Sequence, residues 1–381
     1  MSGKIVTYIS LGSNMGDRHW SLQKALFEIA GDCGPLLSIS KVYESRAMGF
    51  EGADFLNACC GVETTLSPSE LLARLLQIES RMGRGRTPGS GYEARPIDLD
   101  VLYYGDAVLQ TDNLTVPHPG LHERDFVLKP LADIAPQHYH PILKKDTRNL
   151  LQQLRESNDL IKTDLKLHSG RTELFASCPF LAIEGNIGAG KSTLAGRIAE
   201  EFNAKLVLER FADNPFLPKF YEDQSRYAFP LEMSFLADRY QQFTDDTSQF
   251  DLFKNFMVSD YDIYKSLIFA QITLQTEEFD LYRRMFNFMY KEVRKPDIYV
   301  YLYQRTPQLL RNIHKRGRDY EQSISADYLD SIHSGYMEFM RTLPQKNSLI
   351  IDMENKDFVG RIVDYTALLD ILGAKILELS R

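Results

Sequence analysis

Two acidic residues stand two positions apart on a predicted strand in the first half of the chain. Asp98 and Asp100 follow Arg95 in the run Arg-Pro-Ile-Asp-Leu-Asp, and alternate side chains of a strand point to the same face. Two carboxylates this close need a cation between them, and Mg²⁺ typically binds through few carboxylates plus substrate phosphates. From this pair alone, the alternative is the polar outer face of an edge strand.

Basic side chains near this pair favour the metal interpretation. Arg84 and Arg86 lie in a glycine-rich run before the strand, and His118 and Arg124 follow it. Arginine binds phosphate oxygens through paired hydrogen bonds, so arginines beside a metal pair suggest transfer of a phosphoryl or pyrophosphoryl group. The sequence offers no strong general base beside the aspartates, and we assign none.

A second motif, in the other half of the chain, fits the phosphate-loop pattern G-x-x-x-x-G-K-S/T. It follows a predicted strand at 180–183 and opens a predicted helix at 191–202, which is the context that the pattern requires. Backbone N–H groups would surround the phosphates, Lys191 would reach the β- and γ-phosphates, and Ser192 would hold Mg²⁺. A chance glycine-rich turn is the less favoured alternative. The predicted ATP-binding residues are Gly185, Asn186, Ile187, Gly188, Ala189, Gly190, Lys191, Ser192 and Thr193.

The acceptor of the phosphoryl group is indicated by residues downstream of this loop. Glu209 ends a predicted strand at 204–208, at the sheet edge where ligands bind in doubly wound folds, and its carboxylate could take a proton from a hydroxyl group. The basic cluster 314–318 could close over the transferring phosphoryl group. A solvated basic helix end is the alternative for that cluster.

The elements that must position the aspartate pair have the order β-α-β-β-α-β. Periodicity predicts strands at 4–11, 36–43, 55–64 and 97–104, and helices at 19–30 and 69–81. This order predicts an α+β ferredoxin-like sandwich, in which helices cover one face of an antiparallel sheet.

Short apolar strands alternate with helices in the second half, which predicts an α/β fold with a parallel sheet covered by helices on both faces. The strands are expected near 180–183, 204–208, 253–258, 298–303 and 348–351, with helices at 191–202 and 226–243. We expect a first domain over 1–160, a linker over 161–178 and a second domain over 179–381.

Length indicates two domains, and composition is that of an ordinary globular protein. The chain has 381 residues, with 44 Lys and Arg against 52 Asp and Glu, and its net charge of −8 argues against a protein that coats nucleic acid. There is no apolar stretch of about 18 residues and no signal-peptide core, so we expect a cytoplasmic protein without a membrane span. Cys33, Cys59, Cys60 and Cys178 are expected to be reduced, buried thiols.

The first half resembles the 6-hydroxymethyl-7,8-dihydropterin pyrophosphokinase family over residues 4–155. The resemblance rests on the segments 8–14, 55–57, 95–100 and 118–126. It implies folate biosynthesis, in which the hydroxymethyl oxygen of the pterin attacks the β-phosphorus of ATP and AMP leaves.

Residue roles in the first half follow from that resemblance. Asp98 and Asp100 would bind two Mg²⁺ ions. Asn57 would bind the pterin amide edge, Phe126 would stack on the ring, and Phe55 would line the pocket. The residues implied for ATP or the transition state are Arg84, Arg95, His118, Arg124, Arg86 and the loop aromatic Tyr92, and Glu79 would support the loop or the ATP site.

The second half resembles the deoxynucleoside kinase family over 179–381, through the phosphate loop and the segments 213–221, 235–239 and 315–318. The resemblance implies an α/β P-loop kinase fold and ATP-dependent phosphorylation of a deoxynucleoside 5′-hydroxyl, with Mg²⁺ as cofactor and dimerisation through this domain. The implied roles are general base for Glu209, sugar 3′-hydroxyl binding for Tyr221 and Glu321, base contact for Arg239, lid for Arg316 and Arg318, and Mg²⁺ contact through water for Asp260.

Two positions depart from the kinase family's pattern. Relatives carry an arginine after the third strand, whereas Asp260 is followed by Tyr261, and Lys265 is a candidate source of the missing charge. Glu232 replaces the glutamine that reads the nucleobase, and an ionised carboxylate only accepts hydrogen bonds. A salt bridge to Arg239 is an alternative use for Glu232.

Three rival interpretations follow for the second half. The missing arginine motivates a catalytically impaired module that binds nucleotide for regulation or oligomerisation. A P-loop GTPase would need an Asn-Lys-x-Asp base reader, and none follows residue 185. A nucleic-acid-binding fusion would need a basic stripe with interleaved aromatic residues, which the sequence lacks.

Overall fold

The computed structural model describes residues 3–47, 52–85, 94–154, 159–210, 214–248, 253–318 and 321–381. The chain divides into one compact unit of Met1–Leu174 with Ser380–Arg381, and a second of Phe175–Leu379. The segment 161–178, expected to be a linker, contains strand β10 (Leu160–Lys162) and helix α5 (Arg171–Ala176). Because β10 pairs with β3, this strand belongs to the first unit's sheet.

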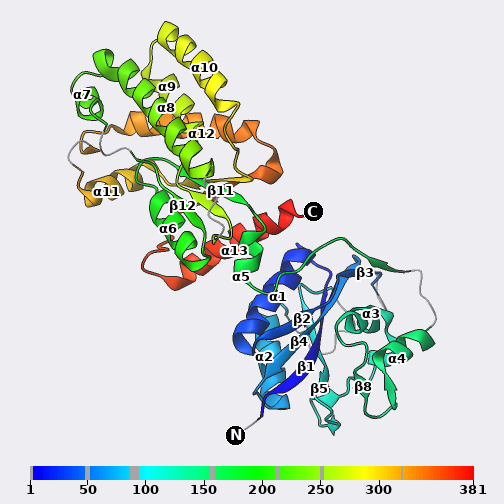
Figure 1. Ribbon diagram of the computed structural model, residues 1–381. Coiled ribbons are helices and arrows are strands. Elements are labelled where there is room, and N and C mark those ends of the chain that lie inside the picture. The colour runs from blue at the N-terminus through cyan, green and yellow to red at the C-terminus, as the bar shows by residue number, and fades with distance from the viewer. Residues whose placement is uncertain are drawn as a thin grey trace. The chain divides into compact units, whose positions relative to one another are not determined.

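The first unit is built on a six-stranded antiparallel sheet (Figure 1). Its order is β10-β3-β4-β1-β5, and β2 also pairs with β4. The strands are β1 (Ile5–Ser13), β2 (Leu36–Ile39), β3 (Tyr43–Ser45), β4 (Phe55–Thr64) and β5 (Asp98–Tyr104).

The strand expected over 36–43 is wrong in extent, because the structure has two short strands, β2 and β3, there. Ser40 lies between them, and its Oγ accepts a hydrogen bond from the Cys59 backbone N–H at 2.8 Å. This side-chain contact replaces a backbone one and interrupts the ladder.

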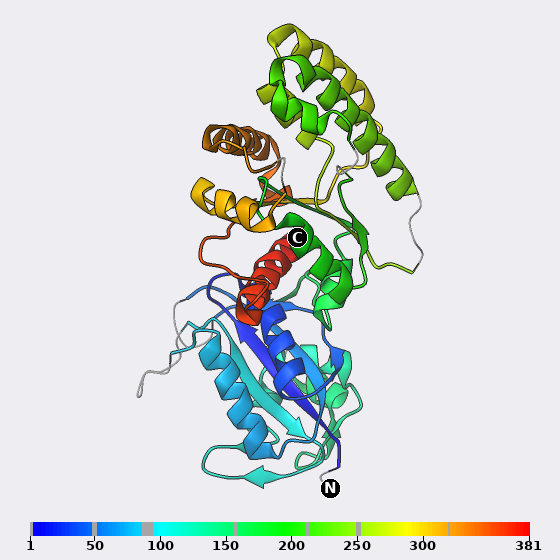
Figure 2. The ribbon, with the colours of Figure 1, turned by 90° about the vertical axis from the view of Figure 1, so that its left-hand side faces the viewer.

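Helices cover both faces of this sheet, so the expectation that helices cover one face is wrong. Helices α1 (Arg18–Asp32) and α2 (Pro68–Arg81) confirm the two predicted helices and lie side by side over one face (Figure 2). They enclose a core that includes Leu11, Leu26 and Leu75. Helices α3 (Asp125–Ile134) and α4 (Thr147–Gln153) pack on the opposite face. Smaller elements are β6 (Leu109–Gln110), β7 (Thr115–Val116), β8 (Tyr139–His140), β9 (Lys145–Asp146) and the 3-10 turn η1 (Leu121–Glu123).

The second unit has a five-stranded parallel sheet, as predicted, with the order β12-β13-β11-β14-β15. Its strands are β11 (Phe180–Gly185), β12 (Lys205–Val207), β13 (Met257–Ser259), β14 (Ile298–Tyr303) and β15 (Ser348–Asp352). The strand expected near 253–258 therefore begins later and is shorter.

Helices lie on both sides of this second sheet, as expected (Figure 1). On one side are α6 (Lys191–Glu201) and α13 (Ile362–Leu379). The core of the other side is formed with α8 (Gln224–Ser248), α9 (Lys265–Thr273), α10 (Thr276–Tyr290) and α12 (Ala326–Thr342). The remaining elements are α7 (Leu217–Glu222), α11 (Thr306–Arg316) and the 3-10 turn η3 (Gln345–Asn347).

The four cysteines are buried and unpaired, which confirms the expectation from the sequence. Within the ranges that the structure describes, no helix has both the length and the apolar character needed to cross a bilayer.

Candidate active sites

Three predicted site residues of the first unit converge on Gly12 of β1. Gly12 is paired with Asn57 of β4 on one side and with Asp98 of β5 on the other. A Cβ atom added to Gly12 would lie 3.6 Å from Asn57 Oδ1, 3.7 Å from the Phe55 ring and 3.9 Å from Asp98 Cβ. The glycine therefore leaves an open position that residues from two neighbouring strands surround.

The two aspartates of β5 lie among cationic side chains. Arg84 binds Asp98 Oδ1 through Nη1, and Arg95 Nη2 lies 3.1 Å from Asp98 Oδ2. Burial and the neighbouring charge of Asp98 raise the pKa of Asp100 to about 6, while Arg95, Arg124 and Arg84 act in the opposite direction. The structure thus brings three predicted arginines around the predicted metal ligands.

These carboxylates fit a hard divalent cation. They lie on one strand, and both burial and the charge of Asp98 raise the pKa of Asp100, so positive charge between the two carboxylates would favour their ionised forms. In this structure the Arg84 guanidinium takes an oxygen of Asp98. Ligation of a metal by that oxygen therefore requires Arg84 to move.

Glu79 explains why Arg84 lies where it does. Its side chain is 2% exposed, and Oε1 accepts hydrogen bonds from the Leu99 backbone N–H at 2.8 Å and from Arg84 Nη1. A carboxylate near the end of α2 thereby binds the backbone of β5 and holds an arginine over Asp98. The role that the sequence suggested for Glu79, support of the loop, is consistent with these contacts.

The predicted pterin-binding residues present one oriented amide and two rings. Asn57 Nδ2 donates to Ser45 Oγ at 2.9 Å and lies 3.4 Å from the Tyr43 carbonyl oxygen, so Oδ1 is left toward Gly12. The Phe55 ring lies 5.6 Å from the guanidinium carbon of Arg95. On α3, the centre of the Phe126 ring lies 5.9 Å from the guanidinium carbon of Arg124.

His118 is held in a neutral, oriented form. Burial and nearby Arg124 lower the pKa of His118, while Asp98 acts in the opposite direction. Its Nδ1 accepts a hydrogen bond from the Gly120 backbone N–H at 3.2 Å, which assigns the proton to Nε2. Two further predicted residues, Arg86 and Tyr92, lie outside the described residues.

The sequence analysis missed Asn14, which positions Arg95. Asn14 Oδ1 accepts from the Arg95 backbone N–H at 2.7 Å, and its own backbone N–H donates to the Arg95 carbonyl at 3.1 Å. Its Nδ2 donates to the Ala53 carbonyl at 3.2 Å. An asparagine directly after a strand commonly binds loop backbone in this way, and that position was the available signal.

The phosphate-loop motif of the second unit connects β11 to α6 through left-handed backbone positions. Gly188 has φ of 80° and Gly190 has φ of 90°, values that side chains with a Cβ rarely adopt. Lys191 Nζ donates to the Asn186 carbonyl at 2.9 Å. Burial and nearby Lys265 lower the pKa of Lys191 to about 8.

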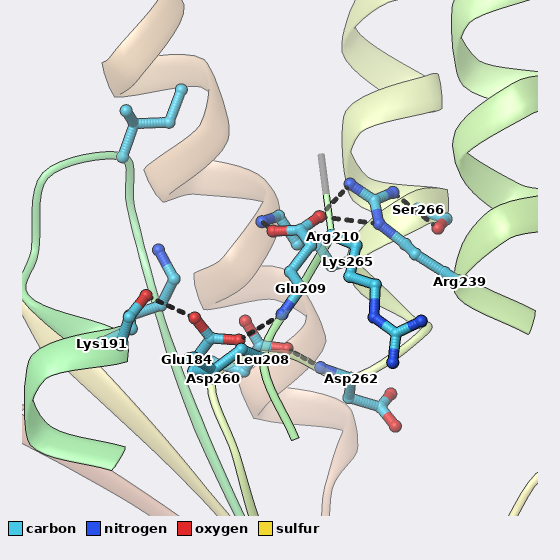
Figure 3. A network of polar contacts seen from close by, with 12 residues as sticks. Glu184, Lys191, Leu208, Glu209, Arg210, Arg239, Asp260, Asp262, Lys265 and Ser266 are labelled. Atoms are coloured by element: carbon cyan, nitrogen blue, oxygen red, sulfur yellow. Dashed lines mark hydrogen bonds and ion pairs between the residues drawn. The ribbon is translucent and has the colours of Figure 1, made fainter. Parts of the chain in front are cut away.

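A serine and an aspartate join this loop to the neighbouring strands. Ser192 Oγ donates to Asp260 Oδ2. The other oxygen of this carboxylate, Asp260 Oδ1, accepts from the Glu209 backbone N–H at 2.8 Å (Figure 3). A loop hydroxyl beside a carboxylate at a strand end is the donor set that holds Mg²⁺ in P-loop enzymes, so these residues fit the ion.

Glu209 lies between two cations (Figure 3). Its Oε1 accepts from Arg239 Nε at 2.8 Å and Nη2 at 2.6 Å, and its Oε2 accepts from Lys265 Nζ at 2.6 Å. Burial opposes ionisation, but Lys265 and Arg239 outweigh it and hold the pKa of Glu209 well below its usual range. Lys265, the candidate source of the charge that an arginine after Asp260 would carry, therefore lies beside Glu209. Arg239, expected beside the base, binds Glu209 and also Ser266 Oγ at 2.7 Å.

The predicted lid arginines lie at the end of α11, which packs on the phosphate loop: Arg316 is the last residue of the helix, and Arg318 lies two positions beyond it. Asn312 of α11 donates to the Gly188 carbonyl at 2.9 Å. Arg316 and Arg318 both pair with Glu321, which was expected to bind the sugar.

A cavity beside the phosphate loop unites the predicted groups of the second unit. Its wall includes Lys191, Glu209, Glu232, Arg239, Arg316 and Glu321. The side chain of Tyr221 lies outside what the structure describes.

Comparisons with known proteins give two separate matches. The family described as 7,8-dihydro-6-hydroxymethylpterin-pyrophosphokinase matches residues 8–136, and the family described as deoxynucleoside kinase matches residues 181–375. Deoxyguanosine kinase of Bacillus subtilis is 37% identical over 193 residues, which are 50% of this chain and 93% of that protein.

Relatives of the first unit come from bacteria and eukaryotes. The 2-amino-4-hydroxy-6-hydroxymethyldihydropteridine pyrophosphokinase of Aquifex aeolicus is 40% identical over 154 residues, which are 40% of this chain and 92% of that protein. Folic acid synthesis protein FOL1 of Dictyostelium discoideum is 38% identical over 160 residues, and the match spans 42% of this chain and 24% of that protein.

Among solved structures, deoxyadenosine kinase from M. mycoides with bound dATP is 22% identical, with a TM-score of 0.45 over 51% of this chain and 98% of that one.

Proposed function

The chain belongs to the 7,8-dihydro-6-hydroxymethylpterin-pyrophosphokinase family through its first half and to the deoxynucleoside kinase family through its second, and we propose that it catalyses one ATP-dependent reaction in each. The first reaction belongs to folate biosynthesis and the second to nucleotide salvage. We assign them to domains over 1–160, with a ferredoxin-like sandwich, and 179–381, with a P-loop kinase fold.

The first domain transfers pyrophosphate from ATP to 6-hydroxymethyl-7,8-dihydropterin and releases AMP. The observation that supports this best is the convergence of Asn57, Phe55 and Asp98 on Gly12. Asn57 Oδ1 is oriented to accept hydrogen bonds from the pterin amide edge, because its NH₂ group is already bound. Phe55 lines the pterin pocket, and Phe126 stacks on the ring.

The cationic groups of this site neutralise the triphosphate. Arg84 exchanges its contact with Asp98 for a phosphate oxygen when ATP binds, and Arg95, His118 and Arg124 bind the developing charge. Asp98 and Asp100 would hold two Mg²⁺ ions, which would draw the phosphates together and offset their charge.

The second domain phosphorylates the 5′-hydroxyl of a deoxynucleoside. Glu209 accepts the hydroxyl proton as the phosphoryl group is transferred, and Lys191 with the lid arginines Arg316 and Arg318 stabilises the charge on that group. Ser192 and Asp260 would hold one Mg²⁺ ion, which would offset charge on the phosphates. Tyr221 and Glu321 would bind the sugar 3′-hydroxyl.

The contact between Lys265 and Glu209 favours catalysis over a purely regulatory role for this domain. The missing arginine motivated the regulatory alternative, and a lysine 2.6 Å from the carboxylate provides the same charge. We also propose that the kinase domain pairs two copies of the chain, which sedimentation of the purified protein would test.

A panel of deoxynucleosides with ATP and Mg²⁺ tests the kinase assignment. We expect monophosphate and ADP from at least one nucleoside, and loss of both with Glu209→Ala. ATP binding without turnover on any nucleoside would instead support the regulatory alternative.

Incubation of the protein with ATP, Mg²⁺ and the pterin tests the first domain. We expect AMP and the pterin diphosphate as products, and we expect Asn57→Ala to raise the KM for the pterin.

A further inference from the structure

A buried carboxylate in the cavity wall has no part in the phosphoryl transfer described above. Glu232 of α8 is 2% exposed. Its Oε1 accepts from Thr273 Oγ1 at 3.1 Å, and its Oε2 has no hydrogen-bond partner among the described residues. Because leaving a buried polar atom unpaired is costly, such atoms in native proteins usually have a function. Here the unpaired oxygen belongs to a residue that lines the cavity.

The same part of the cavity combines this acceptor with cationic donors and aromatic rings. The Arg239 guanidinium carbon lies 4.7 Å from the centre of the Phe235 ring, and Lys265 Nζ lies 5.3 Å from that of Phe269. All four residues line the cavity together with Glu232. A flat heterocycle between such rings would meet a carboxylate at one part of its edge and N–H donors at another.

The edges of the nucleobases differ in how they fit this arrangement. Guanine carries two adjacent donors, N1–H and the 2-amino group, which match the two oxygens of a carboxylate, and its O6 and N7 accept hydrogen bonds from cations. Adenine places the acceptor N1 beside its 6-amino group, so an ionised carboxylate would face a lone pair. Hypoxanthine keeps N1–H and lacks the amino group.

We propose that Glu232 reads the N1–H and 2-amino edge of the base and selects 2-amino-6-oxopurine deoxynucleosides over adenine deoxynucleosides. This inference rests on the kinase function proposed above, because it concerns the acceptor in the same cavity. It assigns the base specificity to a carboxylate of which the protein leaves one oxygen, Oε2, unpaired.

The protonation state of Glu232 adds a signature that a structural role would not produce. Burial raises the pKa of Glu232 to about 7, and Arg239, the Thr273 hydroxyl and Lys265 oppose that rise, while Glu209 adds to it. From α10, the Tyr282 hydroxyl lies 3.4 Å from the Glu232 carbonyl oxygen, so it faces the backbone.

The direction in which pH changes the base preference follows from the hydrogen-bond donors and acceptors that Glu232 offers in its two protonation states. Below the pKa the protonated carboxyl offers one donor and one acceptor, which suits N1 and the 6-amino group of adenine. Above it the carboxylate offers only acceptors, which suits guanine. Preference for deoxyguanosine over deoxyadenosine therefore increases as pH rises through about 7.

The test compares kcat/KM for deoxyguanosine, deoxyinosine, deoxyadenosine and thymidine in the wild type and in Glu232→Gln. Glutamine has nearly the same shape but offers one donor and one acceptor at every pH. Since hydrogen bonds to charged groups are each worth a factor of roughly ten to a hundred, we expect a wild-type preference for deoxyguanosine over deoxyadenosine of at least about tenfold at pH 8. We expect Glu232→Gln to remove or reverse that preference and to abolish its change between pH 6 and 8.

The matched control is Thr273→Val, which removes the hydroxyl bound to Oε1 but keeps the carboxylate. It should retain the preference for deoxyguanosine. An unchanged, pH-dependent preference in Glu232→Gln, or a wild-type preference for deoxyadenosine or thymidine at pH 8, would overturn the proposal.

Calorimetric binding of the same nucleosides separates this proposal from the kinase function. A binding preference that disappears in Glu232→Gln supports base reading even without turnover, in which case only the proposed reaction fails. Equal binding of deoxyguanosine and deoxyadenosine by the wild type refutes base reading even if both are phosphorylated.

Discussion

Replacing Lys265 by methionine should destabilise the second unit without affecting the first. Lys265 Nζ lies 2.6 Å from Glu209 Oε2, and both side chains are at most 10% exposed. A hydrogen bond to a charged group contributes about 1.5–3 kcal/mol, and breaking a buried ion pair costs about 3–5 kcal/mol when the other charge is left unpaired. Arg239 still binds Glu209 in the variant. We therefore expect the free energy of unfolding to fall by about 2–3 kcal/mol, toward the lower of these ranges.

Equilibrium unfolding in urea can assign that loss to one unit. The single tryptophan of the chain, Trp20, lies in α1 of the first unit, so its fluorescence follows that unit while circular dichroism follows both. With a urea dependence of about 2–3 kcal/mol per molar, Lys265→Met should move the transition of the second unit down by about 1 M. The Trp20 transition should not move.

Lys346→Met is the matched control, because Lys346 is an exposed lysine of the same unit. It should unfold like the wild type. Equal midpoints for Lys265→Met and Lys346→Met would refute the reasoning, since the ion pair with Glu209 would then contribute nothing measurable.

Three further variants test the first site. Arg84→Met should strengthen binding of Mg²⁺ alone by about tenfold in calorimetry, because Asp98 loses the cation that competes with the metal. The same variant should slow AMP formation by at least about a hundredfold, because the phosphates lose a positive charge. Weaker Mg²⁺ binding would contradict this competition between Arg84 and the metal. Gly12→Val fills the open position between Asn57 and Asp98 and should raise the KM for the pterin by more than about tenfold. ADP formation from a deoxynucleoside should not change, and an unchanged KM would place the pterin elsewhere. Asn14→Ala removes two side-chain hydrogen bonds and should lower the free energy of unfolding, followed by Trp20 fluorescence, by about 1–3 kcal/mol. It should also lower kcat for AMP formation, because Arg95 loses its anchor; a stability loss with unchanged kcat would limit Asn14 to a structural role.

Local sequence patterns predicted the elements and the residues that lie close together in the chain. The alternation of a strand was enough to place Asp98 and Asp100 together, and the glycines around Lys191 were enough for the phosphate loop. The structure has a Ser67–Glu70 capping box at the start of α2, close to the predicted start of that helix at 69.

Contacts between distant residues could not be predicted in this way. Glu209 binds Arg239 and Lys265, which are 30 and 56 positions away, so the pairing depends on how α8 and α9 pack beside the sheet. Arg239 was accordingly expected at the base. A pattern within one element also does not show that a serine side chain will replace a backbone partner, as Ser40 does between β2 and β3.

The central claim is that one chain carries two independent ATP-dependent sites, and product analysis of two variants tests it most directly. Asp98→Ala should abolish AMP formation with the pterin and leave ADP formation with a deoxynucleoside intact. Lys191→Ala should do the reverse. Loss of both products in either variant, with the protein still folded by circular dichroism, would contradict the account.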